Sequence, residues 1–419
     1  MEYFKNIIGY EHIKKELNRI IDCINNKEKY EQLGVKIPKN LLIHGNPGVG
    51  KTTFSKAFLE ALNRNKYIIR KDKPDGEFVN HINKTINEAI NHQPAVILLD
   101  DIDKFSNNDD DHKNSDEFVV VQSFIDDCKD KDIYFVATAN SLRAMPRSLL
   151  REGRFDTKIE IENPTEQDSA LIIEYYLRDK KVSNDINYLE IARILSCRTC
   201  ATLETIINEA GLYAGFNNKD IIEKEDILEG CLRVLYDSPK NDSQRSKLQL
   251  EIASYHEAGH ALVSEILEPY SVNLVTVENY FGNTGGITSS TKNEDYWYDI
   301  KFMENRIMVL LAGKAAIEVA FNKVDVGVYS DVDRACEVLL RMHEDYFIEN
   351  FNHVVTNRIY PVKEETSGVG KWVILRLQDY YNKSKEIVFN NKDKLEIIAK
   401  ELIEKHILLQ SDMERIIRG

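Results

Sequence analysis

The stretch that decides the fold is "LLIHGNPGVGKTTFSKAF", residues 41–58. An apolar run of strand type leads into a glycine-rich loop, and Lys51 and Thr52 then open a helical pattern. Glycines in such a loop expose backbone N–H groups and admit phosphate oxygens that a side chain would block. The lysine is placed to hold the β- and γ-phosphates, and the threonine hydroxyl to bind Mg²⁺. We therefore predict a nucleotide-binding P-loop made of Gly45, Asn46, Pro47, Gly48, Val49, Gly50, Lys51, Thr52 and Thr53.

The pattern around this loop predicts an α/β fold. Between residues 40 and 160, strand-like apolar runs alternate with helical patterns, which is typical of a parallel sheet with helices on both faces. After Pro164 a period of 3.6 residues dominates, and beyond a polar linker the chain is mainly helical with one strand-like insertion. We expect four segments: an α/β nucleotide-binding domain (1–163), a helical lid (164–236), a linker (237–247) and a mainly helical domain (248–419).

Composition narrows the class of partners. The 419 residues carry a net charge of −14, which argues against a surface built to bind nucleic acid or anionic lipid. No run of 18 apolar residues occurs, so no membrane insertion by this chain is expected. The N-terminus lacks the apolar core of a signal peptide, so the expected compartment is the cytoplasm. Six scattered cysteines fit reduced thiols, with Cys197 and Cys200 interpreted as structural, and the acidic run 107–117 is predicted to be a loop.

Acidic and amide residues follow two further predicted strands. In "AVILLDDID" (95–103), five apolar residues precede Asp100, which is placed to bind the metal beside a P-loop. Asp101 is then placed to orient or deprotonate the attacking water. The run "VATAN" puts Asn140 at a neighbouring strand end, where its amide can hold the γ-phosphate or the water.

The stretch "SLLREGRFD" (148–156) offers Arg151 and Arg154 beside a turn glycine. Loop arginines are usually solvated surface residues. An arginine from a neighbouring subunit can also stabilise the charge on a transferring phosphoryl group, and this second interpretation suits a ring of subunits.

A second candidate site lies in "YHEAGHALV", residues 255–263. If these residues are helical, His256 and His260 lie one turn apart on one face, which suits two imidazoles on one Zn²⁺. Glu257 then lies next to the metal without binding it and can take a proton from a zinc-bound water. The sequence therefore predicts a zinc peptidase centre.

A catalytic zinc needs a third protein ligand, and spacing alone does not choose it. Val263 and Ile266 stand where a metzincin would have glycine and histidine. A downstream carboxylate must serve, and the candidates are Glu318, Asp325, Asp331 and Glu337. In "GVYSDVDRACEVLL", Ser330 is expected to cap a helix, which places Asp331 in the first turn.

Taken in order, these motifs resemble the FtsH family of AAA+ zinc metalloproteases. The resemblance runs from "NIIGYEHIKKEL" through the P-loop, "LLREGRFD", "NEAGLYA", "YHEAGHALV" and "LAGKAAIEVAF" to "NKDKLEIIAKELIEK", nearly the whole chain. It implies a homo-hexameric ring that binds ATP, Mg²⁺ and Zn²⁺, pulls protein substrates through a central pore and cuts them in a chamber.

The resemblance also assigns individual residues. It makes Asp331 the third zinc ligand and Arg151 and Arg154 the arginines that act on a neighbour's nucleotide. Ile8 and Gly9 match the family's adenine-side segment. The stretch "NTGGITSS" (283–290) resembles the edge strand along which these proteases lay an extended substrate.

Four features differ from the family pattern. The usual transmembrane helices are absent, so a relative or form without them is expected. The second acid of the metal-binding strand is Asp101 rather than glutamate. The pore loop is not intact, since "DGEFVNH" (75–81) offers only Phe78 and Val79, and the stretch "FIDDCKDKD" has no clear Asp-Gly-Phe match.

We predict an ATP-dependent zinc endopeptidase that unfolds and degrades proteins. An alternative is a nucleotide-gated peptidase with slow ATP hydrolysis and weak translocation. A third, a remodelling ATPase without proteolysis, is disfavoured by the complete zinc motif.

Overall fold

The structure is a computed structural model of the 419-residue chain. It describes residues 2–35, 37–72, 74–105, 116–237, 245–280, 286–290, 299–324, 327, 329–344 and 366–419. The predicted acidic loop, most of the predicted linker, residues 283–285 and Asp325 therefore lie outside the described residues. The chain forms two compact units, Met1–Gly230 and Cys231–Gly419, and each is described by itself. The predicted domain boundaries at 163, 236 and 247 remain predictions.

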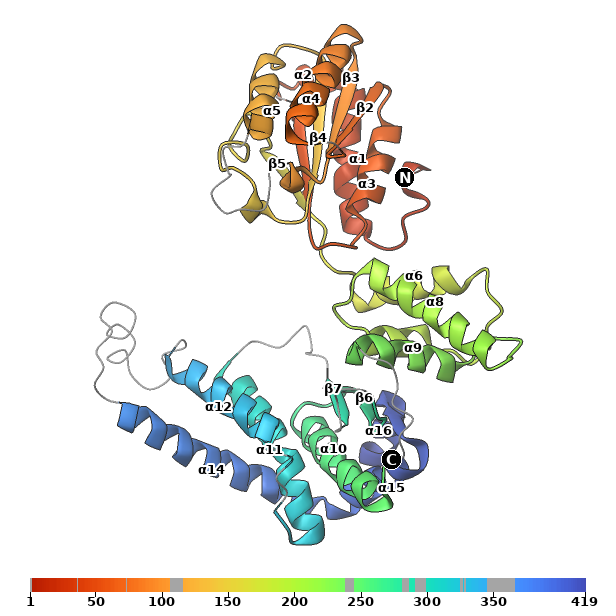
Figure 1. The fold of residues 1–419 in the computed structure, drawn as a ribbon, viewed down its shortest axis with the longest axis vertical. Coiled ribbons are helices and arrows are strands. Elements are labelled where there is room, and N and C mark those ends of the chain that lie inside the picture. The colour runs from red at the N-terminus through yellow and green to blue at the C-terminus, as the bar shows by residue number, and fades with distance from the viewer. Residues whose placement is uncertain are drawn as a thin grey trace. The chain divides into compact units, whose positions relative to one another are not determined.

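The first unit contains the predicted parallel sheet, so the α/β fold class is confirmed. Its strand order is β2-β3-β4-β1-β5, and every neighbouring pair is parallel. The order places the P-loop strand β1 next to β4, with the acidic strand β3 just beyond (Figure 1). The strands are β1 (Asn40–His44), β2 (Asn65–Arg70), β3 (Ala95–Asp100), β4 (Ile133–Ala139) and β5 (Thr157–Glu160).

Helices cover both faces of this sheet because β1, β3 and β4 are apolar on both sides. Leu41, Leu42 and Ile43 are successive and all fully buried, as expected for a strand of a covered parallel sheet. On one face lie η1 (Glu2–Phe4), α1 (Glu11–Asn25) and α3 (Lys51–Ala61) (Figure 1), and the short α2 (Lys27–Glu31), which has no buried residue, follows α1. On the other lie α4 (Asp75–Asn91) and α5 (Asp116–Asp127), packed on one continuous core, with η2 (Ile102–Lys104) and η3 (Leu142–Ala144) after β3 and β4.

Helix α4 corrects one sequence interpretation. Phe78 and Val79 were interpreted as what remains of a pore loop, but they lie in the first turns of α4. The Phe78 side chain is fully buried and packs edge-on against Phe105, with ring centroids 4.9 Å apart. Phe78, Ile82 and Ile86 recur at helical spacing and all face the core. Phe78 is therefore a core residue of α4.

The first unit continues into a helical lid, as predicted. Thr165, Asn187 and Thr199 each accept backbone N–H groups at a helix start, which fixes where three of its helices begin. The lid helices are α6 (Glu166–Leu177), α7 (Tyr188–Ile194), α8 (Cys200–Phe216) and α9 (Lys224–Tyr236), the last of which runs on into the second unit.

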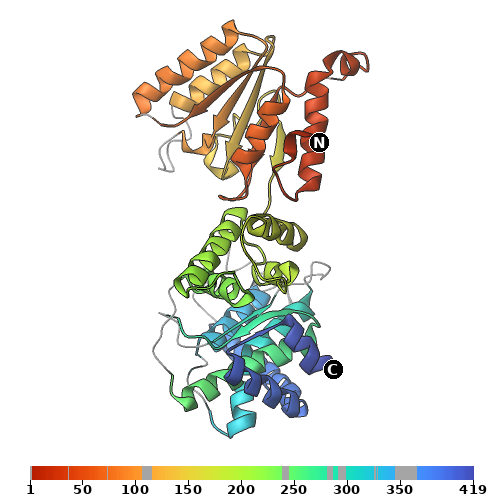
Figure 2. The ribbon, with the colours of Figure 1, turned by 90° about the vertical axis from the view of Figure 1, so that its right-hand side faces the viewer.

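The second unit is mainly helical with a small antiparallel sheet in the order β7-β6-β8 (Figure 2). Its core joins α10, α11 and α12 to α14 and α15 through apolar side chains. The strands are β6 (Val272–Thr276), β7 (Ile287–Ser290) and β8 (Ile407–Leu409). The helices are α10 (Lys247–Leu267), α11 (Ile300–Phe321), α12 (Tyr329–Glu344), α14 (Thr366–Asn390), α15 (Lys392–Lys405) and α16 (Gln410–Arg418).

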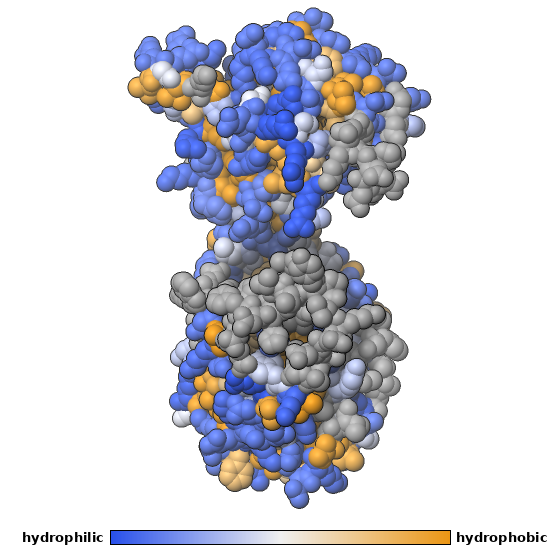
Figure 3. All heavy atoms as spheres, turned by 90° about the vertical axis from the view of Figure 1, so that its left-hand side faces the viewer, coloured by the Kyte–Doolittle hydropathy of each residue, from blue (hydrophilic) through white to orange (hydrophobic). Residues whose placement is uncertain are grey.

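Within the described ranges, no helix is both long enough and apolar enough to cross a membrane. The face drawn in Figure 3 is mostly hydrophilic, with hydrophobic side chains in scattered groups. The apolar residues Ile307, Leu311 and Ala315 of α11 are buried in the core of the second unit.

Candidate active sites

The P-loop has the predicted strand, loop and helix context. It leaves β1 at His44 and enters α3 at Lys51. Gly48 and Gly50 have φ angles of 85° and 98°, which a residue with a side chain rarely adopts. Lys51 is buried, and its Nζ donates to the carbonyl oxygens of Gly45 at 2.9 Å and Asn46 at 2.8 Å. The Lys51 side chain thus lies over the P-loop, where it is predicted to bind the phosphates.

Asp100 meets the P-loop at the end of β3. It is 4% exposed, and its Oδ1 accepts a hydrogen bond from Thr138 Oγ1 at 2.7 Å. Thr52 Oγ1 lies 3.5 Å from the same oxygen. A carboxylate and a hydroxyl at this separation can bind one Mg²⁺ between them, since Mg²⁺ prefers oxygen ligands. Thr138 was not predicted, although a threonine inside the apolar run "FVATA" was a usable signal.

Asp101 lies beside Asp100 in a left-handed backbone conformation, with φ of 54°. Its N–H donates to Thr138 Oγ1 at 2.8 Å, and its Oδ2 pairs with Lys104 Nζ at 2.7 Å. Arg70 lies 3.9 Å from both acids. The sequence reasoning missed Lys104 and Arg70, and these cations offset the charge of the two aspartates.

A pocket of about 570 Å³ lies above the loop, within the range of small-molecule sites. Predicted residues that line it are Ile8, Pro47, Gly48, Val49, Gly50, Lys51, Thr52, Thr53, Asp101 and Asn140. Lid residues Tyr175, Tyr176 and Glu204 close another side. Gly9 does not line the pocket, but Tyr10 N–H next to it donates to Asp168 of the lid at 3.1 Å. Exposed backbone N–H groups, a lysine and an apolar wall fit a nucleotide.

The two predicted arginines differ in their surroundings. Arg151 is exposed. Arg154 is partly buried and bound within its own chain, with Nη2 2.7 Å and Nε 3.3 Å from the two carboxylate oxygens of Asp126. Arg151 is thus exposed, whereas Arg154 is held against α5.

Helix α10 carries the second site. His256 and His260 lie one turn apart, and their Nε2 atoms are 3.0 Å from each other. Asp331, from the first turn of α12, places Oδ2 3.1 Å from His256 Nε2 and 3.4 Å from His260 Nε2. Ligand atoms of these three residues lie within 4.8 Å of one another. Two imidazoles and one carboxylate are a donor set that fits a catalytic zinc with one position left open.

The other carboxylates left open by spacing do not join this cluster. Glu318 pairs with Lys385 at 2.7 Å and accepts from the Tyr381 hydroxyl, and Glu337 is exposed on α12. Helix α12 begins at Tyr329, so Ser330 lies within it and does not cap it. The packing of α12 against α11 is what selects Asp331.

Two neighbours that were not predicted as site residues line the cluster. The backbone carbonyl of Val309 lies 2.7 Å from His260 Nδ1, so it fixes which ring nitrogen faces Asp331. A Cβ at Gly313 of α11 would lie 2.5 Å from His256 Cε1 and 2.6 Å from His260 Nε2. Gly313 therefore leaves the space in which a metal ion would fit between these nitrogens and the helix.

Charges also favour a cation here. Burial lowers the pKa of His260, but its hydrogen bond to Asp331 and the charges of Glu257 and Asp331 outweigh burial and raise it. Burial raises the pKa of Asp331, but hydrogen bonds from His256 and His260 outweigh it and bring it well below its ordinary value. The aspartate thus remains a carboxylate and can serve as a ligand.

Glu257 lies against the small sheet. It is 5% exposed, and Thr288 of β7 places Oγ1 2.8 Å from its Oε2. Its neighbour His256 belongs to the cluster, so the carboxylate lies beside the metal position without joining it. Strand β7 is an edge strand, as the resemblance implied for 283–290, over the residues that are described.

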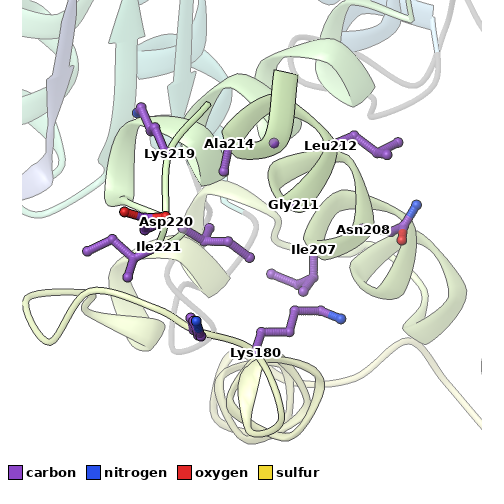
Figure 4. A pocket seen from close by; sticks show the side chains of 12 residues that line it. Lys180, Ile207, Asn208, Gly211, Leu212, Ala214, Lys219, Asp220 and Ile221 are labelled. Carbon is purple, nitrogen blue, oxygen red and sulfur yellow. The ribbon is translucent and has the colours of Figure 1, made fainter. Parts of the chain in front are cut away.

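The lid carries a smaller hollow of about 330 Å³ beside α8, where Ile207 and Gly211 lie near Lys180 and Ile221 (Figure 4). None of the predicted site residues lines it. Cys197 and Cys200 are free cysteines, and the Cys200 thiol and the Tyr10 hydroxyl are hydrogen-bonded, with Sγ and Oη 3.4 Å apart.

Comparison with known proteins matches both halves of the chain. Residues 41–163 match the ATPase family associated with various cellular activities (AAA), and residues 243–416 match peptidase family M41. ATP-dependent zinc metalloprotease FtsH 2 of Phytoplasma mali is 30% identical over 99% of this chain and 62% of its own length. The protein of the same name from a Thermoanaerobacter species is 28% identical over 99% of this chain and 82% of its own length. The chain thus spans less than two thirds of the first relative.

A P-loop ATPase module followed by a histidine and carboxylate metal site defines a class, the AAA ATPases joined to a metallopeptidase. Within that class, the chain carries an AAA module and an M41 peptidase domain, and over 99% of its length it is similar to the FtsH ATP-dependent zinc metalloproteases of these two organisms.

Proposed function

We propose that this chain is an ATP-dependent zinc endopeptidase that cleaves protein or peptide substrates as a ring of six copies. The observation that carries the proposal is the cluster of His256, His260 and Asp331 with Glu257 next to it. The names of the relatives, which describe ATP-dependent zinc metalloproteases, support the same reaction class.

In the peptidase unit, His256, His260 and Asp331 would hold the metal. When bound, Zn²⁺ lowers the pKa of a bound water to about 7 and polarises a carbonyl. Glu257 takes a proton from the attacking water and later gives it to the leaving amine. The outer edge of β7, which pairs with no other strand in the described part of the chain, offers backbone groups to which an extended peptide can add as a further strand.

In the ATPase unit, the P-loop N–H groups and Lys51 bind the phosphates, while Thr52 and Asp100 hold Mg²⁺. Asp101 and Asn140 face the pocket and orient the attacking water. Arg151 of one copy stabilises the charge on the phosphates bound to the next, with Arg154 fixing the loop that carries it.

A second candidate is a nucleotide-gated peptidase that hydrolyses ATP slowly and unfolds substrates weakly. Two observations favour this second candidate. Asp101, the residue predicted to activate the water, is paired with Lys104, and Phe78 is buried and so does not contact a substrate in a pore. Degradation of a folded and an unfolded protein, each with and without ATP, separates the two. A gated peptidase cleaves only the unfolded protein, whereas an unfolding protease degrades both when ATP is present. No zinc-dependent cleavage of either substrate would refute both.

A further inference from the structure

Glu257 is held by Thr288 of the edge strand β7 and by Gly286, the residue just before that strand. Thr288 Oγ1 lies 2.8 Å from Glu257 Oε2 and 3.3 Å from the Glu257 backbone oxygen. Gly286, two residues earlier, lies so close that a Cβ there would come within 2.4 Å of Glu257 Cγ and 2.8 Å of its Cδ. The Glu257 carboxylate therefore accepts a hydrogen bond from the Thr288 hydroxyl, and the backbone of Gly286 packs against its Cγ and Cδ atoms.

We propose that Thr288 is a positioning residue for the general base, so that β7 sets the base as well as the edge to which a substrate strand adds. This inference rests on the proposed peptidase function. An ionised carboxylate only accepts hydrogen bonds, and the Thr288 hydroxyl has one proton to give. Thr288 occupies one carboxylate oxygen, which leaves the other to take the proton from the attacking water.

The position of Thr288 in the sheet supports this role. Thr288 pairs with Val275 of β6, and β6 in turn pairs with β8, so the hydroxyl is carried by a three-stranded sheet. Glu257 is carried by α10, in which the flanking Ala258 and the ligand His260 are buried. The hydrogen bond thus ties the helix that carries the metal ligands to the strand that carries the substrate edge. A peptide that pairs with β7 would be registered against the same strand that orients the base.

The test is cleavage of an unstructured fluorogenic peptide by the full chain loaded with zinc. Thr288→Val keeps the shape of the side chain and removes the donor. We expect kcat to fall about 10- to 100-fold, as for a misplaced catalytic group, with KM and zinc content unchanged. Thr288→Ser restores a hydroxyl and should recover most of kcat. A loss of fold alone would lower zinc content and the melting temperature together.

Ser264→Ala is the matched control, because it removes a buried hydroxyl that lies 2.9 Å from Ser271 Oγ and has no contact with Glu257. It should leave kcat unchanged. Wild-type kcat in Thr288→Val, or a Thr288→Ser variant as slow as Thr288→Val, would overturn the inference. Failure of the proposed peptidase function would give a different result. The wild-type protein would then either not cleave the peptide or cleave it as fast as Glu257→Gln does.

Discussion

Arg154 is bound by Asp126 of its own chain through two hydrogen bonds, Nη2 to Oδ2 at 2.7 Å and Nε to Oδ1 at 3.3 Å. Its Nη1 also donates to the Ser148 carbonyl at 2.6 Å. A guanidinium with these partners would have to give them up to reach a neighbour's nucleotide. Arg151 and Arg154, for which the sequence predicts the same role, therefore differ in their surroundings, and we propose different roles for them.

We expect Arg151→Ala to lower ATPase kcat by a factor of 10³ or more, the order of an arginine-finger loss, while nucleotide binding is retained. Wild-type specific activity should rise with protein concentration, because a monomer lacks the neighbour's charge. Steady-state ATPase assays over a concentration series measure both effects. Arg147→Ala, another exposed arginine of the same segment, is the control and should keep its activity. Concentration-independent activity in a monomer would contradict the ring.

Arg154→Ala should act mainly on stability. The substitution leaves Asp126 without its arginine, whose hydrogen bond is the main reason that the pKa of Asp126 lies below its ordinary value. The pair is only partly buried, so we expect a loss of about 1 kcal/mol in the free energy of unfolding. Denaturant titration measures it. A fully stable but inactive Arg154→Ala protein would instead show that Arg154 acts on the nucleotide.

In the peptidase site, the predicted general base and the predicted metal ligands are different residues, so substitutions can test the two roles separately. Glu257→Gln should abolish peptide cleavage with zinc still bound, since the glutamine cannot take a proton and the three ligands remain. Asp331→Ala should lose the metal instead. Zinc content and peptide cleavage, measured on both variants, check the assignment, and near-normal cleavage by Glu257→Gln would refute it.

Gly313→Ala tests whether the space beside the cluster is reserved for a metal. The added Cβ would press on His256 and His260 ring atoms at 2.5–2.6 Å, so zinc affinity should fall although no ligand is changed. Gly215→Ala on α8 is the control, because a Cβ there meets nothing within 4 Å, and it should leave zinc binding unchanged. Zinc titration decides, and equal affinity in both variants would mean that the cluster tolerates the methyl group.

The sequence predicted the parallel sheet and the P-loop because both are written in local patterns. Spacing left the third ligand open, because Asp331 reaches His256 through the packing of α12 on α11, and only the FtsH resemblance pointed to Asp331. The roles of Gly313 and Thr288 were missed, although both lie in stretches that carry the resemblance, because each residue matters only through what lies beside it. Phe78 was set against the family's pore loop and found incomplete, whereas its helical spacing with Ile82 and Ile86 already indicated a core position.

Phe78→Ala should therefore destabilise the first unit and not simply stop substrate pulling. The ring is fully buried against Phe105, and deletion of such a side chain costs about 3–5 kcal/mol. Thermal unfolding of the full chain measures it, with Glu77→Ala on the exposed side of α4 as the control. An unchanged melting temperature together with lost degradation of a folded protein would contradict this prediction and indicate that Phe78 acts in a pore loop.

Asp101 is where this chain departs most plainly from the FtsH pattern, and two features of its surroundings bear on the rate of ATP hydrolysis. Aspartate is one methylene shorter than glutamate, so its carboxylate lies about 1–1.5 Å further from a water in line with the γ-phosphate. In addition, Oδ2 is paired with Lys104. The backbone of Asp101 is left-handed, a conformation that aspartate adopts more readily than glutamate.

We expect Asp101→Glu to raise ATPase kcat by up to about 100-fold with little change in KM, because the longer side chain reaches the water while Lys51, Thr52 and Asp100 still bind the nucleotide. The same variant should lose about 1 kcal/mol of stability to the left-handed backbone. Lys104→Met separates the effect of side-chain length from the effect of the ion pair with Lys104. The lysine side chain of this pair is exposed, so removal of the pair should raise kcat much less than Asp101→Glu does. Steady-state kinetics and denaturant titrations of the three proteins measure these effects. A wild-type kcat equal to or above that of Asp101→Glu would show that Asp101 already fits its water and that the distance argument is wrong.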